Sequence, residues 1–264
     1  IGVGGYVTGP VIYAANKLGY PTFIHEQNSI PGKCNSFLAK YVTLIGTSFK
    51  STIDKFPKDK TVFTGNPCSE DALKQPVMSK SEFGLLETKK LVLIVMGSLG
   101  SSKINDYFIN SLSTFNKKNY QVLYVTGKSS YDELKKIKVP TNVKLVPYID
   151  NMTRIMKNTD VMVTRAGAST LSEIIALKVP SIIIPSPYVP DNHQYKNAIN
   201  LVDKNAAMMI EEKDLKGDIL VRTIDLLISD NNKLKAMKDN LEEFTIKNSA
   251  TIIYDNIKKI IGEK

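Results

Sequence analysis

Short apolar runs alternate with amphipathic stretches along almost the whole chain, and this alternation restricts the possible folds more than any other feature. Strands that alternate with helices form parallel sheets with helices on both faces. The runs have the length and composition of buried strands, at residues 22–25, 42–46, 61–64, 91–96, 121–126, 143–146, 161–163, 181–184 and 207–210. The stretches predict helices at 10–18, 31–41, 102–115, 130–136, 152–157, 170–177, 194–203 and 248–261.

A break in the pattern falls at residues 66–79, where Pro67, Pro76 and the polar residues between them indicate a linker. About three strands precede it and a complete series of strands and helices follows it. We therefore expect two α/β domains, residues 1–68 and 69–247. The first is small for such a domain and opens on a glycine turn with no strand before it, so we expect the chain to be a fragment that lacks its natural start.

The chain has 264 residues with 35 basic and 26 acidic side chains, a net charge of +9. This excess favours anionic partners such as phosphates, nucleic acid or an acidic lipid surface, although drift toward lysine would also produce it. Nucleic acid is disfavoured, because the chain has no tryptophan and no basic run interleaved with aromatic residues. Its cysteines, Cys34 and Cys68, form no disulfide framework and have no histidine at the spacing of a zinc site.

Three strand–turn–helix junctions carry small residues where a ligand could approach the backbone, at 2–10, 96–102 and 164–173. Free N–H groups at a helix start favour anions. Ser98 could donate its hydroxyl to a phosphate, whereas in the third junction Thr170 and Glu173 also fit a capping box that would explain both residues. No lysine follows at P-loop spacing. Three such junctions in one chain favour a nucleotide ligand.

Two further polar stretches stand where sites commonly form. His25-Glu26-Gln27-Asn28 ends an expected strand, and Asp191-Asn192-His193-Gln194 precedes an expected helix. Side-chain amides there could bind sugar hydroxyls. Ordinary alternatives are a hydrogen-bonded loop start for the first stretch and a helix cap by Asp191 or Asn192 for the second.

These segments occur in one order over essentially the whole chain, and the ordered set resembles the MurG family of UDP-N-acetylglucosamine-dependent transferases, part of glycosyltransferase family 28. The resemblance is carried by GVGGYVTGP at 2–10, HEQN at 25–28, TGNP at 64–67, GS at 97–98, RAGASTLSE at 165–173, and DNHQ at 191–194 followed by NA at 197–198.

The resemblance implies a GT-B fold, in which two Rossmann-like domains with parallel sheets face each other across a cleft. It implies that residues 248–264 return to the first, incomplete domain. The implied reaction transfers N-acetylglucosamine from UDP-GlcNAc, with inversion, to the 4-hydroxyl of the MurNAc-pentapeptide of lipid I, giving lipid II. The implied partners are UDP-GlcNAc, lipid I and an anionic membrane surface, with a peripheral location at the cytoplasmic face of the bacterial plasma membrane.

The resemblance also assigns binding residues. The acceptor pyrophosphate is expected at Gly4, Gly5, Tyr6 and Thr8. Of the donor, uracil is expected to contact the Ile149 backbone and the ribose to contact Glu173, while the diphosphate contacts Ser98. The phosphates and sugar are expected to lie on the turn formed by Ala168, Ser169, Thr170, Leu171 and Ser172. The GlcNAc group is expected to contact Gln194, His193 and Asn28.

The chain departs from the family pattern at several points. Met96 replaces a usual glycine, Ser69 stands where an arginine near uracil is common, and the glycine-rich loop with a histidine proposed as general base has no counterpart. The general base is therefore unassigned; for Glu26, the acidic candidate inside a motif, we favour a structural or sugar-positioning role. No Asp-x-Asp pair occurs, so we expect no metal or other cofactor, with helix N-termini stabilising the UDP leaving group.

Two other functions remain open at this point. One is a nucleotide-sugar-binding module without catalysis, because the family's proposed base has no match. The other is a GT-B transferase with a different lipid acceptor, which the motifs at 2–10 and 26–28 disfavour because they belong to the acceptor side.

Overall fold

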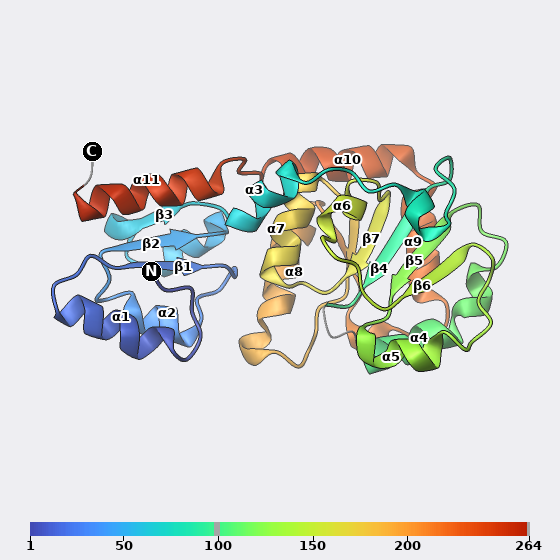
Figure 1. Ribbon diagram of the computed structural model, residues 1–264, viewed down its shortest axis with the longest axis horizontal. Helices are drawn as coiled ribbons and strands as arrows, with labels where there is room; N and C mark the ends of the chain where they lie inside the picture. Colours follow the sequence, from blue (N-terminus) through green and yellow to red (C-terminus); the bar gives the residue numbers. More distant parts are fainter. Residues whose placement is uncertain (98–100, 263–264) are drawn as a thin grey trace.

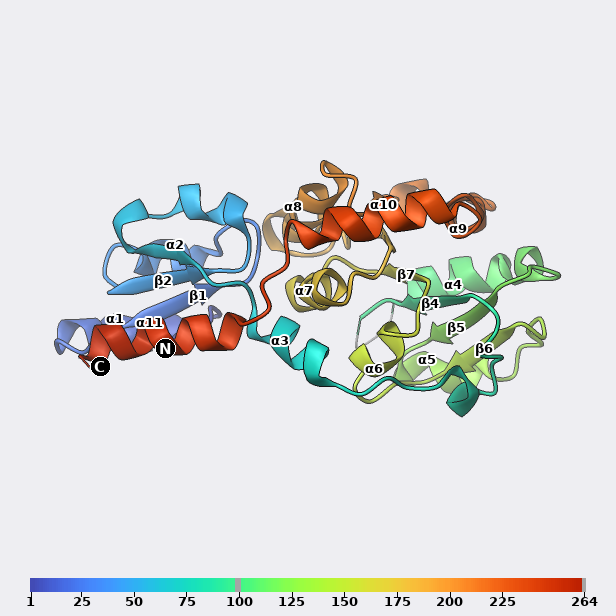
Figure 2. The same cartoon turned by 90° about the horizontal axis from the view of Figure 1, so that it is seen from above.

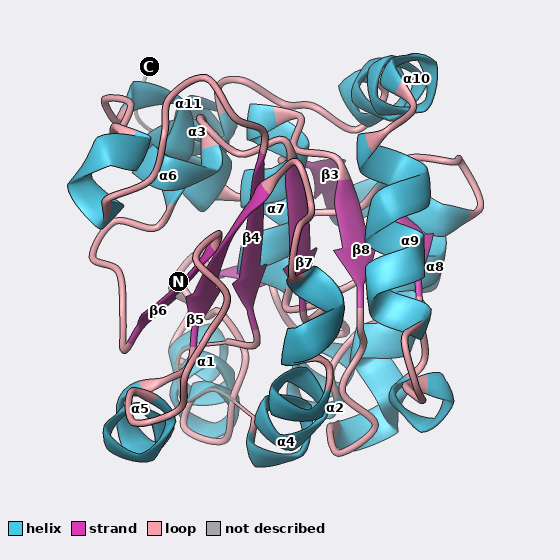
Figure 3. Ribbon diagram, turned by 90° about the vertical axis from the view of Figure 1, so that its right-hand side faces the viewer, coloured by secondary structure: helices cyan, strands magenta, loops and turns pink. Residues whose placement is uncertain are grey.

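The computed structural model describes residues 1–97 and 101–262, which form two lobes that lie side by side (Figure 1). The first lobe contains a parallel sheet in the order β1 (Phe23–Glu26), β2 (Leu44–Thr47) and β3 (Thr61–Phe63). The second contains a parallel sheet in the order β6-β5-β4-β7-β8-β9, of which Figure 3 labels β6, β5, β4, β7 and β8. Its strands are β4 Leu91–Val95, β5 Gln121–Val125, β6 Val143–Val146, β7 Val161–Thr164, β8 Ser181–Ile183 and β9 Met208–Met209. The expected α/β fold with two parallel sheets is confirmed.

The first lobe has helices on both faces of its sheet. Helices α1 (Thr8–Lys17) and α2 (Lys33–Leu38) lie on one side, and α11 (Ser249–Ile261) lies on the other (Figure 1). Short 3-10 turns, η1 (Lys50–Lys55) and η2 (Lys58–Lys60), connect β2 to β3. The core beneath α1 and α2 is a small apolar cluster that includes Ile12, Ile24, Leu38, Ile45 and Phe56.

The second lobe is built around β4, in which every residue is buried. Alternate side chains point to opposite faces, so Val92 and Ile94 join one apolar cluster while Leu91, Leu93 and Val95 join another. The first cluster includes residues of α4 (Ser102–Asn110), α5 (Lys128–Leu134) and α9 (Ile219–Ile228), and the second includes residues of α6 (Thr153–Met156), α7 (Ala168–Leu177) and α8 (His193–Val202). The remaining short turns of this lobe are η3 (Lys80–Phe83), η4 (Leu112–Phe115), η5 (Pro190–Asn192) and η6 (Glu212–Asp214).

The linker expected at 66–79 is partly wrong, because helix α3 (Pro67–Lys74) begins there. Asn66 Oδ1 accepts a hydrogen bond from the Cys68 N–H at 3.3 Å, and Pro67 occupies the first helical position, where a missing N–H costs nothing. A proline that follows asparagine therefore starts a helix here. Helices α9 and α10 (Asn231–Glu242) were also not expected, although Asp230 caps α10 by accepting from two N–H groups at 3.0 Å.

The chain crosses between the lobes on either side of α3 and again before α11. Figures 1 and 2 both place α11 beside the first sheet, and the Ala250 N–H donates to Glu70 on α3 at 3.0 Å. The crossing before α3, at Gly65, packs closely against the crossing before α11, at Ser249. A Cβ added at Gly65 would lie 2.5 Å from the Oγ of buried Ser249. The assignment of 1–68 with 248–264 to one domain and of 69–247 to the other stays a prediction.

We predict that Gly65→Ala destabilises the chain by about 3 kcal/mol, because it adds a clash with Ser249 to the strain of a φ of 69°. The control is Gly217→Ala, where φ is 54° but no described atom lies within 4 Å of the added Cβ, and a loss of about 1 kcal/mol is expected. Urea unfolding measures both. Equal losses would mean that the two crossings do not restrain each other.

Candidate functional site

The second sheet has a topological switch point between β4 and β7, because the chain leaves β4 toward β5 on one side and later adds β7 on the other. Ligands of such sheets bind in the crevice at the carboxyl ends of the strands beside this point. A cavity of about 180 Å³ lies there, between the end of β4 at Val95 and the end of β7 at Thr164. Three residues expected from the sequence, Ile149, Thr170 and Glu173, line it together.

Glu173 is the acidic group of this crevice. Burial, with a smaller contribution from the negative charge of Asp71, raises the pKa of Glu173 to about 7 from its ordinary 4.5. The carboxyl group therefore changes charge near neutral pH, and hydrogen-bond donors that approach it favour the ionised form. Such a group can accept hydrogen bonds from two neighbouring hydroxyls of a ligand.

The start of α7 is bare. The helix begins at Ala168 after Gly167, and within the described part of the chain no side chain caps it, so the capping box expected from Thr170 and Glu173 is wrong. The N–H groups of the first helical turn have no intrahelical partners, and the helix dipole adds positive potential beside them. The turn therefore has the properties of an anion-binding site.

Two of the residues expected on this turn face away from it. The Leu171 side chain is fully buried in the core, and its N–H donates to Gly167 O at 2.9 Å. Buried Ser172 donates its hydroxyl to Ala168 O at 2.8 Å, while its own carbonyl accepts from Ser69. Helical geometry turns these positions inward, so the groups available on this turn belong to Ala168, Ser169 and Thr170.

Helix α8 lies beside α7 and supplies amide groups. Gln194 Oε1 accepts from the Ala166 N–H at 3.2 Å and from the Ser186 N–H at 2.9 Å, which leaves its Nε2 group for a ligand. The cap by Asp191 or Asn192, which was the ordinary alternative for this stretch, does not form among the described residues. His193 Nδ1 lies 2.9 Å from Pro190 O, which fixes the ring.

A second cavity, of about 450 Å³, is lined by both lobes. The first lobe contributes Gly4, Gly5 and Asn28, and the second contributes Asp191 and His193. Both glycines have φ above 80°, which side chains rarely adopt. The cavity therefore brings part of the expected acceptor loop next to residues expected to bind the donor sugar.

Glu26 lines this cavity but is fully engaged within the protein. Its Oε1 accepts from the Asn28 N–H and Nδ2, and its Oε2 accepts from the Gly32 N–H and from Asn35 Nδ2, at distances of 2.8 to 3.1 Å. The carboxylate thus holds the loop after β1 and has no free position for a substrate proton. Neighbouring His25 is buried with Nε2 2.9 Å from Gly65 O, and burial lowers its pKa.

Two other expected residues do not line the cavity between the lobes. Tyr6 is 94% exposed and does not line the cavity between the lobes. Thr8 also lies outside the lining and donates its hydroxyl to Gly4 O at 2.5 Å, so it shapes the glycine loop. Ser98 lies outside the described residues.

Sequence reasoning missed the buried polar residues that hold these loops. Arg165 donates to Glu212 Oε2 at 2.6 Å, to Ile184 O and to Ser101 Oγ, and so joins the ends of β7 and β8 to the start of α4. Burial opposes ionisation of Glu212, but its hydrogen bond to Arg165 and the charge of that guanidinium lower its pKa overall. Asn197 similarly connects the two lobes. Arg165 and Asn197 belong to motifs that are visible in the sequence, but their hydrogen-bond partners are distant in sequence.

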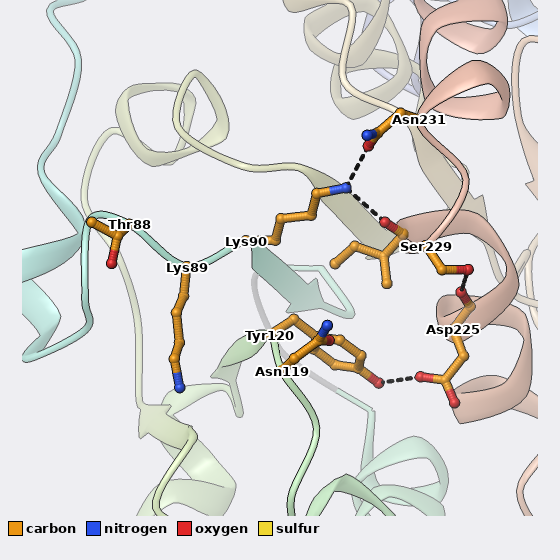
Figure 4. Close-up of a pocket in the computed structure, with 9 residues that line it drawn as sticks. Thr88, Lys89, Lys90, Asn119, Tyr120, Asp225, Ser229 and Asn231 are labelled. Atoms are coloured by element: carbon orange, nitrogen blue, oxygen red, sulfur yellow. Dashed lines mark hydrogen bonds between the residues drawn. The ribbon is translucent and has the colours of Figure 1, made fainter.

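Another pocket, of about 530 Å³, lies at the opposite edge of the second sheet, at the amino ends of β4 and β5 (Figure 4). Lys90 Nζ donates to Ile228 O and Asn231 Oδ1 at 2.7 Å, and the Tyr120 hydroxyl donates to Asp225 at 2.9 Å. These polar groups satisfy one another, so we place the candidate site at the carboxyl edge.

Two Rossmann-like lobes, with a switch-point crevice in the second, are the architecture of the GT-B glycosyltransferases. The model of the glycosyltransferase family 28 C-terminal domain matches residues 91–253, and that of the N-terminal domain matches residues 1–47. The chain belongs to glycosyltransferase family 28.

Curated relatives agree with this assignment. A Bacillus cereus protein named UDP-N-acetylglucosamine--N-acetylmuramyl-(pentapeptide) pyrophosphoryl-undecaprenol N-acetylglucosamine transferase 1 is 46% identical, with 99% of this chain and 73% of the relative covered. The Bacillus licheniformis protein of the same name, without the numeral, is 44% identical, with 98% and 72% covered. The chain therefore spans about three quarters of the length of these relatives.

Solved structures give the same fold. The crystal structure of Acinetobacter baumannii MurG has a TM-score of 0.80 and 26% identity, covering 98% of this chain and 73% of that one. A Staphylococcus aureus MnaA–UDP co-structure has a TM-score of 0.71 at 14% identity, covering 99% and 75%. The second likeness shows the fold alone.

Residues 1–97 and 101–262 contain no group of three or more His, Cys, Asp or Glu side chains arranged to hold a metal ion. No helix in these ranges has both the length and the apolar character that crossing a bilayer requires.

We predict that Glu173 makes the stability of the unliganded chain fall as pH rises. Its folded pKa of about 7 lies above the ordinary value, so the folded state keeps a proton that the unfolded state has lost. Between about pH 5 and about pH 8, wild type should lose about 1–2 kcal/mol relative to Glu173→Gln. Urea unfolding across this range measures the difference.

The negative charge of Asp71, which contributes to the raised pKa of Glu173, provides a control. Asp71→Asn removes the second cause of the raised pKa, so the pH-dependent loss should be smaller and should end at lower pH. Parallel stability profiles of wild type and Glu173→Gln would contradict the prediction.

Proposed function

We propose that the chain transfers N-acetylglucosamine from UDP-GlcNAc to the 4-hydroxyl of the MurNAc-pentapeptide of lipid I, with inversion, giving lipid II. The observation that carries the proposal is the switch-point crevice, where the bare start of α7 and the carboxyl group of Glu173 lie one helical turn apart. The diphosphate and the ribose of a nucleotide have this separation. The diphosphate accepts hydrogen bonds, as the N–H groups at the start of α7 require, and the ribose hydroxyls donate them, as the carboxyl group of Glu173 requires. The names of the family 28 relatives supply the identities of donor and acceptor.

In the proposed donor complex, the diphosphate lies on the N–H groups of Ala168, Ser169 and Thr170. The ribose hydroxyls donate to Glu173, and uracil contacts the backbone at Ile149, which lines the same cavity. The sugar extends toward the cavity between the lobes, which His193 and Asn28 both line. Gln194 contributes its free Nε2 group from α8.

As the glycosidic bond breaks, negative charge develops on the UDP oxygen. The start of α7 offers roughly half a positive charge in a fixed position, so it stabilises the leaving group without reorganisation. The acceptor hydroxyl approaches from the first lobe, where Gly4 and Gly5 keep the backbone accessible. The acceptor oxygen bonds to the anomeric carbon as the bond to UDP breaks, and its proton passes to a general base other than Glu26. Glu26 holds the loop that carries Asn28.

We predict that Glu173→Ala raises the dissociation constant for UDP-GlcNAc about 10- to 100-fold, because a charged acceptor for the ribose is lost. In wild type, binding should tighten as pH rises through about 7, since the ionised carboxylate is the better acceptor. UDP-GlcNAc is suitable because its diphosphate diester does not titrate near this pH. Calorimetry from about pH 6 to about pH 8 measures both effects.

The control is Glu133→Ala, an exposed glutamate on α5, which should leave binding unchanged. A labelled-sugar assay with a soluble lipid I analogue then tests transfer. Saturable donor binding without transfer would support a nucleotide-sugar-binding module, and normal binding by Glu173→Ala would remove the ribose assignment.

We further propose that the first lobe docks on an anionic membrane surface at the cytoplasmic face of the plasma membrane. Val7, Val11 and Leu18, four and seven residues apart, share one face of α1, and each is more than half exposed. Phe37 on neighbouring α2 is 52% exposed, and Lys17 ends α1 with an exposed cation. Apolar side chains beside lysines suit an acidic leaflet.

We predict that Val11→Asp weakens binding to phosphatidylglycerol vesicles about tenfold, because it places a charge in the apolar stripe and repels the anionic surface. Val77→Asp is the matched control, since Val77 on the second lobe is 60% exposed and Val11 is 58% exposed. Vesicle sedimentation at low and high salt measures binding. Equal effects of the two substitutions would contradict docking through α1.

A further inference from the structure

We infer that Asn197 is a positioning residue that makes the sugar contact of Asn28 depend on the approach of the two lobes. The inference rests on the proposed function, because it takes Asn28 as a contact of the donor sugar. Asn197 lies on α8 in the second lobe and its side chain is fully buried. Its amide makes hydrogen bonds in both lobes, to Ser29, Asn28 and Ala166.

Within the second lobe, Asn197 and Gln194 lie one turn apart on α8 and hold the peptide groups of Ala166 from both directions. Asn197 Nδ2 donates to Ala166 O at 3.2 Å, and Gln194 Oε1 accepts from the Ala166 N–H at 3.2 Å. Ala166 is fully buried and directly precedes Gly167, the residue before the bare start of α7. The two amides therefore fix the backbone that leads into the anion-binding turn.

Toward the first lobe, the same Asn197 amide determines how Asn28 is oriented. Asn197 Oδ1 accepts from the Ser29 N–H at 2.8 Å, and Asn197 Nδ2 donates to Asn28 Oδ1 at 3.1 Å. Asn28 Nδ2 donates to Glu26 Oε1 at 3.1 Å, which leaves its second hydrogen for a ligand in the cavity between the lobes. Asn28 thus presents a donor because Asn197 occupies its acceptor.

All hydrogen-bonding groups of the Asn197 amide are engaged, and its bonds divide between the lobes. A rotation that separates the lobes breaks the bonds to Ser29 and Asn28 and leaves the bond to Ala166. Loss of Asn197 leaves buried polar groups unpaired in both lobes, which carries a full desolvation cost. The effect that passes through Asn28 depends on the donor sugar. Without Asn197, Gln194 still accepts from the Ala166 N–H at 3.2 Å and holds the backbone before the anion-binding turn, so UDP binding changes little.

Asn200 provides a matched contrast on the same helix. It lies three residues further along α8 and also bonds to the first lobe, accepting from the Ser51 hydroxyl at 2.7 Å, but this contact is exposed. It touches neither Asn28 nor Ala166 in the described hydrogen bonds. A general contribution of contacts between the lobes would affect both asparagines, whereas positioning of Asn28 requires Asn197.

The test compares the affinities of the wild-type chain and its variants for UDP and UDP-GlcNAc by calorimetry. Asn197→Ala is expected to raise the dissociation constant for UDP-GlcNAc about tenfold and that for UDP less than about twofold. Asn28→Ala should produce the same pattern, and the double variant should lose no more than either single variant. Asn200→Ala should change both constants less than about twofold.

Three results would overturn the inference: equal losses for UDP and UDP-GlcNAc in Asn197→Ala, additive losses in the double variant, or unchanged binding. Should Asn197→Ala fail to fold, hydrogen exchange of the wild-type Ser29 amide decides, since UDP-GlcNAc but not UDP is expected to slow it. Equal exchange with both ligands would then overturn it. Failure of wild type to bind UDP-GlcNAc would instead overturn the proposed function, and this inference with it.

Discussion

The parallel pairing of β4 with β5 on one side and β7 on the other determines where this protein can bind a ligand. The strand order opens a crevice between the carboxyl ends of β4 and β7, and the turn after β7 leads directly into α7. That turn is Ala166-Gly167-Ala168, and no side chain in the described part of the chain makes a capping hydrogen bond to the start of the helix. The anion site therefore follows from strand order and small residues, and the groups around it serve to fix these elements.

The fixing groups are buried polar side chains that span distant parts of the chain. Arg165 joins the ends of two strands to Ser101 at the start of α4, and its pairing with Glu212 keeps a buried cation neutralised. On the other side of the turn, Gln194 and Asn197 hold both peptide groups of Ala166. Such a framework keeps a bare backbone in one conformation, which preorganised binding of a diphosphate requires.

Much of the fold could be predicted from the sequence, because the signals for it are local. Every expected strand is present, because a strand buried on both faces of a parallel sheet is a continuous apolar run that the sequence shows directly. Two local predictions were wrong because the same residues are compatible with more than one local structure. Pro67 suggested a linker but starts α3 behind Asn66, and Thr170 and Glu173 fitted a capping box although the helix begins at Ala168.

The site could be predicted only in part, because the family motifs identify residues but not what they contact. Glu173 and Ile149 do line one crevice, whereas Leu171 faces the core. Glu26 shows this most clearly: the sequence favours a structural or sugar-positioning role for it over proton transfer, but does not identify its partners. Four hydrogen bonds from Asn28, Gly32 and Asn35 make it the centre of a rigid loop. Whether a buried carboxylate serves chemistry or architecture is decided by the hydrogen-bond partners around it, and most of those partners become visible only when the chain is folded.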